Sequence, residues 1–231
     1  MKNLLFAIML LFATTASPQK DVTKFLGIPV DGTKNAMIDK LIDKGFTYNK
    51  AGDYLEGEFN GKTVQLHVVT NNNKVYRIVV NDVLTVDEGN IKIQFNRLCQ
   101  QFKNNKHYFA IKQQEIPEDT DISHEIIVKD KRFEASFYQD VDFSAVDTTA
   151  CMLQVKEIMT NSYSQEELKN PTEEMWQKMF EMYKVLCFAR ILEVAQNKSV
   201  WFMITYYKGI GQYGITMYYD NGYNRANGED L

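Results

Sequence analysis

The sequence predicts an α+β protein in which helices pack on antiparallel β-meander sheets, built as two related units with a helical insertion. Three observations lead to this prediction. A helix-like segment is twice followed by a series of short strand-like segments, turn residues separate those strands, and one long helical segment interrupts the second series.

The first helix is expected to begin after Thr33 and to end near Gly45. Thr33 is a good N-cap because its hydroxyl can accept a hydrogen bond from a free backbone N–H of the first turn. Gly45 suits the position after the helix, where left-handed backbone is common. The apolar residues between them recur at helical spacing, at Met37, Ile38, Leu41 and Ile42.

Three strands are expected next, at 54–59, 63–69 and 75–80. Asn60-Gly61 is a strong signal for a two-residue hairpin, and the asparagines at 71–73 mark the following turn. In the middle strand Val64, Leu66 and Val68 alternate with polar residues. One face of this meander is therefore expected to be apolar, with the helix covering it.

The second unit repeats this order. Residues 85–88 can cap a helix whose apolar residues follow at intervals of four, three and four, from Ile91 to Phe102. Turns are expected at Asp130-Lys131 and at 209–211. The expected strands lie at 108–112, 125–129, 132–138, 200–207 and 212–219.

Residues 141–198 break the pattern and are interpreted as a helical insertion, a lid or a partner contact. Their strongest helix runs from 171 to 196, with Asn170 as N-cap, Pro171 at the first helical position and Glu173 at the third. Apolar residues occur nearly all round this helix, which predicts burial against more than one surface.

Residues 1–16 have the pattern of a secretory signal peptide, in which Lys2 precedes an apolar run and small residues lead to an expected cleavage after Ala16. The apolar run is shorter than the roughly 20 residues needed to span a bilayer, and no other segment suggests a transmembrane helix. We therefore expect a periplasmic or secreted protein. The expected domains are the signal peptide at 1–16, a first helix-plus-meander unit at 17–86, a second helix-plus-sheet unit at 87–140 and 199–231, and the helical insertion at 141–198.

Composition and cysteine content narrow the function classes. With 26 Lys+Arg against 30 Asp+Glu, the chain has no basic excess that would favour nucleic acid as a partner. Cys99, Cys151 and Cys187 are odd in number and widely spaced, which argues against a disulfide scaffold. Buried free thiols are one interpretation, and one disulfide with one remaining thiol is the other.

The run Ile28-Pro29-Val30-Asp31-Gly32-Thr33, followed by a helix and an antiparallel meander, resembles the unit shared by β-lactamase-inhibitor proteins and the small outer-membrane-assembly lipoprotein BamE. Two such units in tandem would cover about 23–140 and 199–220, and the insertion departs from that pattern. The segment 218–231 also resembles the ending of a group of uncharacterised secreted proteins of Gram-negative bacteria. The resemblance implies a binding module of the cell envelope.

No catalytic residue, metal ligand or cofactor is predicted. The segment 209–214 fits G-x-G-x-x-G, but a strand-like segment follows it where a phosphate site needs a helix, so a hairpin turn is expected. His67, His107 and His124 lack metal-ligand spacing, with His67 on the polar strand face and His124 at the start of a strand. No G-x-S-x-G elbow is present.

Aromatic residues are dense after residue 198, and aromatic side chains supply rigid, amphipathic contact area. Successive strand residues point to opposite faces, so one set is expected in the core. The other set forms either a ligand platform or the seat of the inserted helix, and we favour the helix. The candidate binding residues are Trp201, Tyr207, Tyr218, Tyr219 and Tyr223.

These observations predict a secreted, non-enzymatic binding module of the bacterial cell envelope. Its partner is expected to be another envelope protein, a peptide or a glycan. One alternative is a hydrolase whose site forms from sequence-distant residues, which a cleft with a carboxylate pair or a His–carboxylate contact would favour. The other is a structural component of an envelope complex, which predicts a large exposed apolar patch on the insertion.

Overall fold

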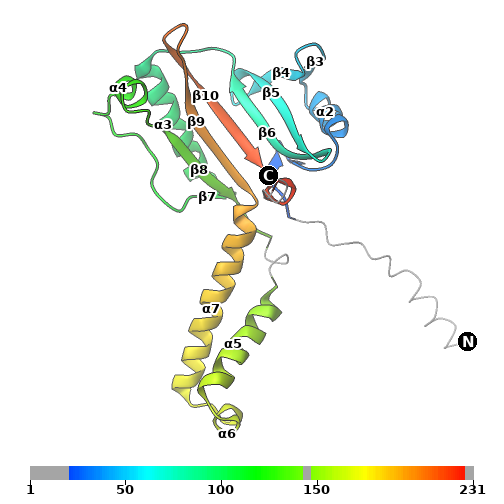
Figure 1. Cartoon of the computed structure of the whole chain (residues 1–231), viewed down its shortest axis with the longest axis vertical. Helices are drawn as coiled ribbons and strands as arrows, with labels where there is room; N and C mark the ends of the chain where they lie inside the picture. Colours follow the sequence, from blue (N-terminus) through cyan, green and yellow to red (C-terminus); the bar gives the residue numbers. More distant parts are fainter. Residues whose placement is uncertain (1–20, 143–146, 227–231) are drawn as a thin grey trace, which may run out of the picture.

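The computed structural model describes residues 21–142 and 147–226. The predicted signal peptide and its cleavage site lie outside the described residues. The α+β class is confirmed: helices pack against one eight-stranded antiparallel sheet, and a helical insertion projects from one end of it (Figure 1).

The strand order is β3-β4-β5-β6-β10-β9-β8-β7, so two four-stranded meanders meet in the middle of one sheet. They join where β6 pairs with β10, with Val80 opposite Met217 and Ile78 opposite Tyr219. A helix precedes each meander. The first series is α2 (Lys34–Ile42), β3 (Thr47–Asn49), β4 (Tyr54–Phe59), β5 (Lys62–Asn71) and β6 (Lys74–Asp82), and the second is α3 (Glu88–Asn104), β7 (Tyr108–Phe109), β8 (Glu134–Gln139), β9 (Ser199–Tyr207) and β10 (Gln212–Asp220).

The local signals of the first series are confirmed. The Thr33 hydroxyl accepts a hydrogen bond from the backbone N–H of Ala36 at 3.4 Å and caps α2, and Gly45 has a φ of +97°. Asn60 and Gly61 have φ values of +51° and +73°, the left-handed pair that a type I′ hairpin requires. The short strand β3 was not predicted, because three residues are too few to show a period.

One face of the sheet carries the core. The alternation in β5 buries Val64, Leu66 and Val68, and the register carries the same face across β6, β10, β9 and β8. Helices α2 and α3 both cover this face, since their buried residues belong to the same hydrophobic cluster. A two-strand hairpin, β1 (Lys24–Phe25) and β2 (Ile28–Pro29), adds Phe25, whose ring centroid lies 4.8 Å from that of Tyr219.

Helix α3 forms where it was predicted, and its N-cap is Asp87, within the expected capping segment 85–88. The Asp87 carboxylate accepts from the backbone N–H of Asn90 at 2.9 Å. The Thr85 hydroxyl is instead hydrogen-bonded to the side chain of Gln212. The Glu88 carboxylate accepts from the backbone N–H of Ile122 at 2.8 Å and so holds the start of the next helix.

Two predicted strands are wrong. Residues 125–129 belong largely to helix α4 (Ile122–Ile127), because Asp121 caps this segment by accepting from the backbone N–H of His124 at 2.7 Å. Strand β7 ends at Phe109 instead of residue 112. The chain then crosses to α3, where the Asn96 amide bonds both backbone groups of Ile116 at 2.7 and 2.8 Å.

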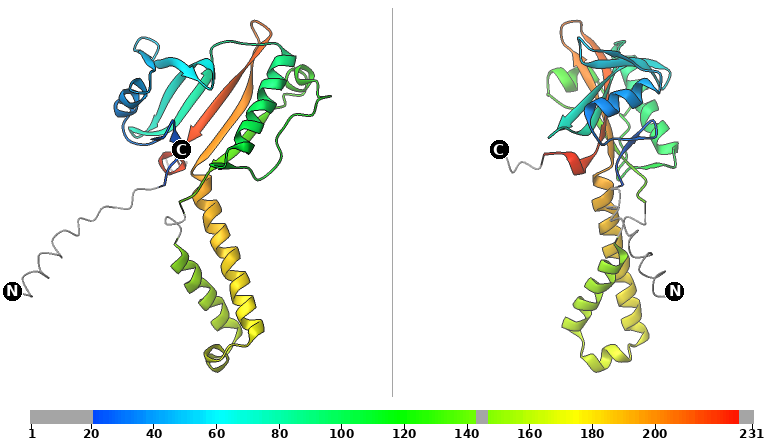
Figure 2. Two further views of the ribbon diagram at one scale, coloured as in Figure 1. Left: turned by 180° about the vertical axis from the view of Figure 1, so that it is seen from behind. Right: turned by 90° about the vertical axis from the view of Figure 1, so that its right-hand side faces the viewer.

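The insertion between β8 and β9 forms a helical hairpin of α5 (Thr148–Ser162), α6 (Gln165–Lys169) and α7 (Glu173–Gln196), which extends away from the sheet in both views of Figure 2. The N-cap of α7 is Thr172, whose hydroxyl accepts from the backbone N–H of Met175 at 3.3 Å, so the prediction of Asn170 is wrong. As predicted, α7 packs on more than one surface, on α5 over most of its length and on Phe109 and Tyr138 near its C-terminal end. Its burial is only partial, since Met175 and Ala195 are its fully buried residues. Within the described ranges, no helix is both long and apolar enough to cross a membrane.

Candidate functional site: the open face of the sheet

The second face of the sheet has no helix on it among the described residues. Helices α2, α3 and α4 contribute their buried residues to the core on the other face, and the insertion projects away from the sheet (Figure 1). The expectation that the inserted helix seats on the aromatic strand face is therefore wrong. The face stays open, with Trp201, Met203, Thr205 and Tyr207 of β9 half-buried at alternate positions.

A stacked aromatic pair lies near the middle of this open face. Trp201 and Tyr218 are cross-strand partners in β9 and β10, and their ring centroids are 3.9 Å apart with an interplanar angle of 15°. The Arg77 guanidinium of β6 lies 4.8 Å from the Tyr218 ring centroid and 5.5 Å from that of Trp201. Three adjacent strands thus contribute one cation and two rings to a single cluster.

Asp220 fixes the geometry of this cluster. Its carboxylate accepts from Nε and Nη2 of Arg77 at 2.6 and 2.7 Å, and from Nε1 of Trp201 at 3.0 Å. Only 20% of the Arg77 side chain and 10% of the Asp220 side chain are exposed. The hydrogen bond with Asp220 raises the pKa of Arg77, and burial raises the pKa of Tyr218. The four side chains, here called the Trp201 cluster, are therefore held in one arrangement before any ligand binds.

The other predicted binding residues lie apart from the cluster. Tyr207 shares the open face, where its ring packs beside Gly214, and burial raises its pKa. Tyr219 points to the opposite face, is 5% exposed and belongs to the core, so the structure removes it from the candidate surface. Tyr223 lies beyond β10 in the short helix η2 (Gly222–Asn224). Arg77 was not predicted, because nothing near it in sequence indicates its pairing with Asp220.

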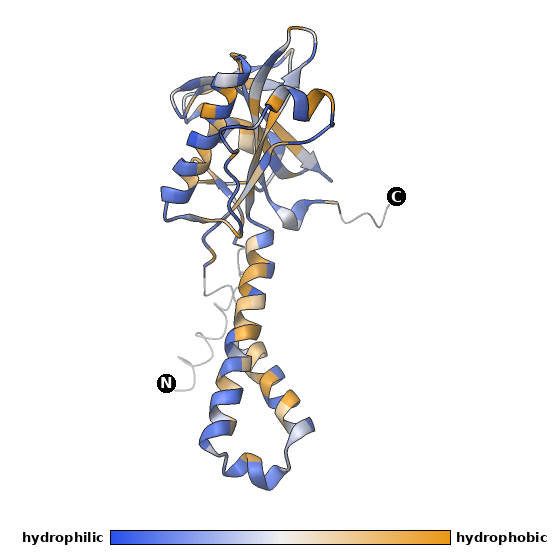
Figure 3. Ribbon diagram, turned by 90° about the vertical axis from the view of Figure 1, so that its left-hand side faces the viewer, coloured by the Kyte–Doolittle hydropathy of each residue, from blue (hydrophilic) through white to orange (hydrophobic). Residues whose placement is uncertain are grey.

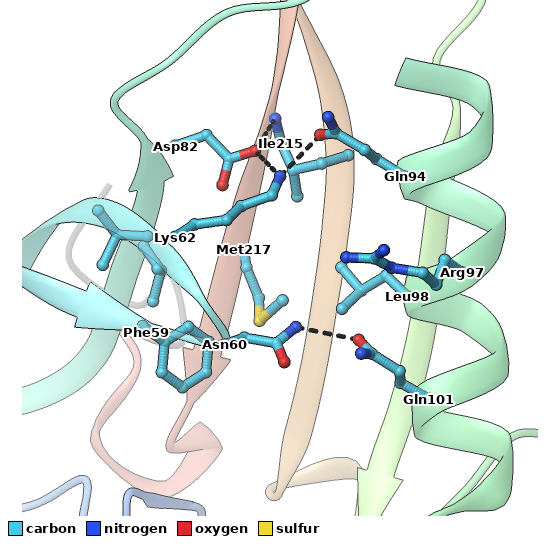
Figure 4. Close-up of a pocket in the computed structure, with 12 residues that line it drawn as sticks. Phe59, Asn60, Lys62, Asp82, Gln94, Arg97, Leu98, Gln101, Ile215 and Met217 are labelled. Carbon is cyan, nitrogen blue, oxygen red and sulfur yellow. Dashed lines mark hydrogen bonds and ion pairs between the residues drawn. The ribbon is translucent and has the colours of Figure 1, made fainter. Parts of the chain in front are cut away.

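A narrow cavity on the helix side of the sheet separates α3 from the β4–β5 hairpin (Figure 4). Lys62 spans it, with Nζ 2.7 Å from the Asp82 carboxylate and 2.7 Å from the Gln94 side-chain oxygen. Asn60 and Gln101 bond across it at 3.0 Å. With a volume of about 40 Å³, it has room for water but not for an organic ligand.

A larger groove of about 910 Å³ continues from this cavity along α3. His107 and Asp140 line it, with Nδ1 and Oδ2 3.3 Å apart, and they are 72% and 56% exposed. This is the kind of contact that was expected to favour the hydrolase alternative. No Ser, Thr or Cys is among the described residues that line the groove, and the hydroxyl groups on its lining belong to Tyr108 and Tyr219.

The remaining sequence motifs take structural positions. Residues 209–214 form the β9–β10 turn and the start of β10, as predicted, with the backbone N–H of Gly211 bonded to the Tyr207 carbonyl at 3.0 Å. His67 lies on β5, and His124 lies in α4 rather than at the start of a strand. In the part of the chain that the structure describes, no group of three or more His, Cys, Asp or Glu residues could hold a metal ion.

The helical hairpin carries a second candidate surface, made of exposed large apolar side chains. Hydropathy colouring shows apolar residues along α7 as well as on α5 (Figure 3). Trp176 is 55% exposed, and Phe180 and Phe188 are each 60% exposed. The exposed hairpin residues, as they are called below, are Met152, Leu153, Ile158, Trp176, Phe180, Val185 and Phe188.

The fold and these surfaces define an α+β protein with an open, partly aromatic sheet face and a projecting helical hairpin. Comparison with protein-family models, with curated proteins and with solved structures found no match.

Proposed function

We propose that this chain is an exported, non-enzymatic binding protein of the bacterial cell envelope, and that it binds a protein partner on the open face of its sheet. The observation that carries the proposal is the Trp201 cluster. Trp, Tyr and Arg are the residues that most often dominate the binding energy of protein interfaces. Here one of each lies on the same uncovered surface, held by Asp220.

The geometry favours a protein over a glycan. Tyr218 lies on the strand between those of Arg77 and Trp201, and its ring contacts both of them. Less of its ring plane is therefore free to stack on a sugar. A rigid surface with polar edges suits a protein partner, since little side-chain entropy is lost when it binds.

Export rests on the signal-peptide pattern of residues 1–16. Two further observations support an envelope binding module. The order of a helix and a four-stranded meander occurs twice, and the two meanders form one continuous sheet. This is the tandem order that the resemblance to β-lactamase-inhibitor-like units implies, and an uncovered sheet provides a broad binding surface.

The proposal is tested by cross-linking the full chain in its native envelope and identifying the partner by mass spectrometry. Trp201→Ala and Tyr218→Ala should each weaken binding of the purified partner by at least about 30-fold, the effect of losing about 2 kcal/mol at a hot spot. Tyr54→Ala is the matched control, because Tyr54 is half-buried on β4, away from the Trp201 cluster in the strand order. Unchanged partner binding in both cluster variants, with the fold intact by circular dichroism, would refute the proposal. If the unaltered chain and the control bind a glycan and the cluster variants do not, the partner is a glycan rather than a protein.

The exposed hairpin residues favour a second candidate function, that of a structural component in an envelope complex. Large apolar side chains at this exposure mark protein contact surfaces. Phe180→Ser combined with Phe188→Ser should then release the chain from a co-purifying assembly, as judged by size-exclusion chromatography. The exposed Glu181→Ser is the matched control on the same helix. Retention of the double variant in the assembly would exclude this role for the hairpin.

A further inference from the structure

The seam between α5 and α7 follows a regular pattern. Buried residues recur every four positions on α5, at Cys151, Val155 and Met159. Side chains that face α5 recur at the same interval on α7. They are Met175, Met179, Tyr183 and Cys187. In an antiparallel pair such ladders run in opposite directions, so each step on one helix meets a step on the other.

The far end of the hairpin fixes the register of these ladders. The Tyr163 hydroxyl accepts a hydrogen bond from Nζ of Lys178 at 3.3 Å, and Met175 is buried in the same hydrophobic cluster. Counting back from this end in steps of four brings Val155 to the level of Tyr183, and the next step brings Cys151 to the level of Cys187.

The two thiols at that level are neighbours across the seam. Cys151 is 1% exposed and Cys187 is half-buried, and burial together with the neighbouring Cys187 thiol raises the pKa of Cys151. The neighbouring Cys187 also raises the pKa of Tyr183, which lies one turn earlier on the same side of α7. Two cysteines at the same level of a helix–helix seam can form a disulfide when their Cα atoms come within about 4.4–6.8 Å of each other.

We propose that Cys151 and Cys187 form an intramolecular disulfide that clasps α5 to α7 when the chain is exposed to a disulfide oxidant. The inference goes beyond the proposed binding function and stands without it. It also leaves Cys99 as the odd cysteine, because Cys99 lies on α3, is 2% exposed and belongs to the core of the sheet rather than to the α5–α7 seam.

The chemistry is a two-step thiol–disulfide exchange. The Cys187 thiolate attacks a disulfide oxidant, such as glutathione disulfide, forming a mixed disulfide and releasing one thiol. The Cys151 thiolate then attacks the Cys187 sulfur and releases the second thiol. The protein loses two protons and two electrons, and the oxidant is reduced to two thiols. Burial raises the pKa of Cys151, which favours Cys187 as the first nucleophile.

The test uses the purified full chain, equilibrated with mixtures of reduced and oxidised glutathione, quenched by alkylation and mapped without reduction by mass spectrometry. The expected product is a Cys151–Cys187 bridge with a mass lower by two hydrogen atoms, while Cys99 is alkylated only after unfolding. Cleavage at the hairpin tip should leave two fragments that separate on a denaturing gel only after reduction. Glutathione adducts or intermolecular dimers at Cys187, in place of the bridge, would overturn the proposal. The unaltered chain alone is enough for this test.

A matched variant tests whether seam geometry selects the pair. Cys151→Ser combined with Leu153→Cys keeps three thiols but moves one to a position that is 62% exposed on the same helix. Its bridged fraction should be at least about tenfold lower than that of the unaltered chain at the same glutathione ratio, because the exposed thiol has a low effective concentration at Cys187. Equal bridging in this variant, with helicity unchanged by circular dichroism, would show that the seam geometry does not direct the pairing.

Discussion

Removing one partner of the Arg77–Asp220 ion pair should destabilise the fold by about 3 kcal/mol. Breaking a buried pair costs roughly 3–5 kcal/mol, because the remaining charge has left water without a counter-ion. The low end applies because 20% of the Arg77 side chain is still exposed. Asp220→Ala also leaves Nε1 of Trp201 without its acceptor.

The assay is urea unfolding of the purified chain followed by circular dichroism, with thermal unfolding as a second measurement. For a domain of this size, 1 kcal/mol shifts Tm by about 2–4 °C. Asp220→Ala should therefore lower Tm by about 6–12 °C. The urea slope should stay unchanged, since the variant alters stability and not the surface exposed on unfolding.

A double variant separates the pair from its surroundings. Replacing both members by leucine removes the unpaired charge, so the double variant should recover to within about 1 kcal/mol of the unaltered chain. The reasoning is refuted if Asp220→Ala costs less than about 1 kcal/mol, the value of a surface ion pair. It is also refuted if the double variant loses as much stability as the sum of the losses caused by replacing Arg77 alone and Asp220 alone.

Three further predictions concern the core and the edge of the sheet. Gln114→Ala should lower the free energy of unfolding by about 2 kcal/mol. The Gln114 side-chain amide donates to the carbonyl of Ser136 in β8 at 2.7 Å and accepts from its N–H at 2.5 Å, as a neighbouring strand would. Gly57→Ala should lower the free energy of unfolding by about 1–3 kcal/mol, since an added Cβ would lie 2.6 Å from the ring of Phe46. Burial raises the pKa of Cys99 to about 12, so stability that is present below pH 9 should fall as pH rises toward 12, and fall less in Cys99→Ala.

Each of these predictions has a control or an excluding result. The exposed Gln113→Ala should leave stability within about 0.5 kcal/mol, and Gly209→Ala should do the same because nothing lies within 4 Å of its added Cβ. If urea unfolding shows equal losses of stability in Gln114→Ala and Gln113→Ala, the hydrogen bonds of Gln114 to β8 do not stabilise the sheet edge. Parallel pH profiles of the unaltered chain and Cys99→Ala would contradict the argument from burial of the thiol.

The elements predicted correctly from sequence are those set by local chemistry. The Thr33 cap, the Asn60-Gly61 turn and the alternation in β5 each need only neighbouring residues. The segment 125–129 was mispredicted because its β-branched residues suggest a strand, whereas the cap at Asp121 and the long-range contact from Glu88 impose a helix. Propensity is a weak prior, and tertiary contacts overrode it here.

The candidate site was only partly predictable for the same reason. Aromatic density drew attention to Trp201 and Tyr218, but it also led to the wrong prediction of Tyr219, which alternates onto the core face. The partnership of Arg77 with Asp220 spans 143 positions of sequence and depends on β6 meeting β10. In α7, apolar residues on every side predicted burial, yet periodicity cannot tell a buried helix from one whose apolar residues stay exposed.

The helical hairpin replaces what would otherwise be a simple turn between two neighbouring strands. Its two ends meet at the sheet, where the backbone N–H of Gln139 bonds the carbonyl of Lys198 at 3.1 Å. Because the folded insertion brings its own ends together, its length adds little to the entropy of closing β8 onto β9. Evolution can therefore lengthen, shorten or recode this projection without disturbing the register of the sheet, and the two surfaces of the molecule can diversify separately.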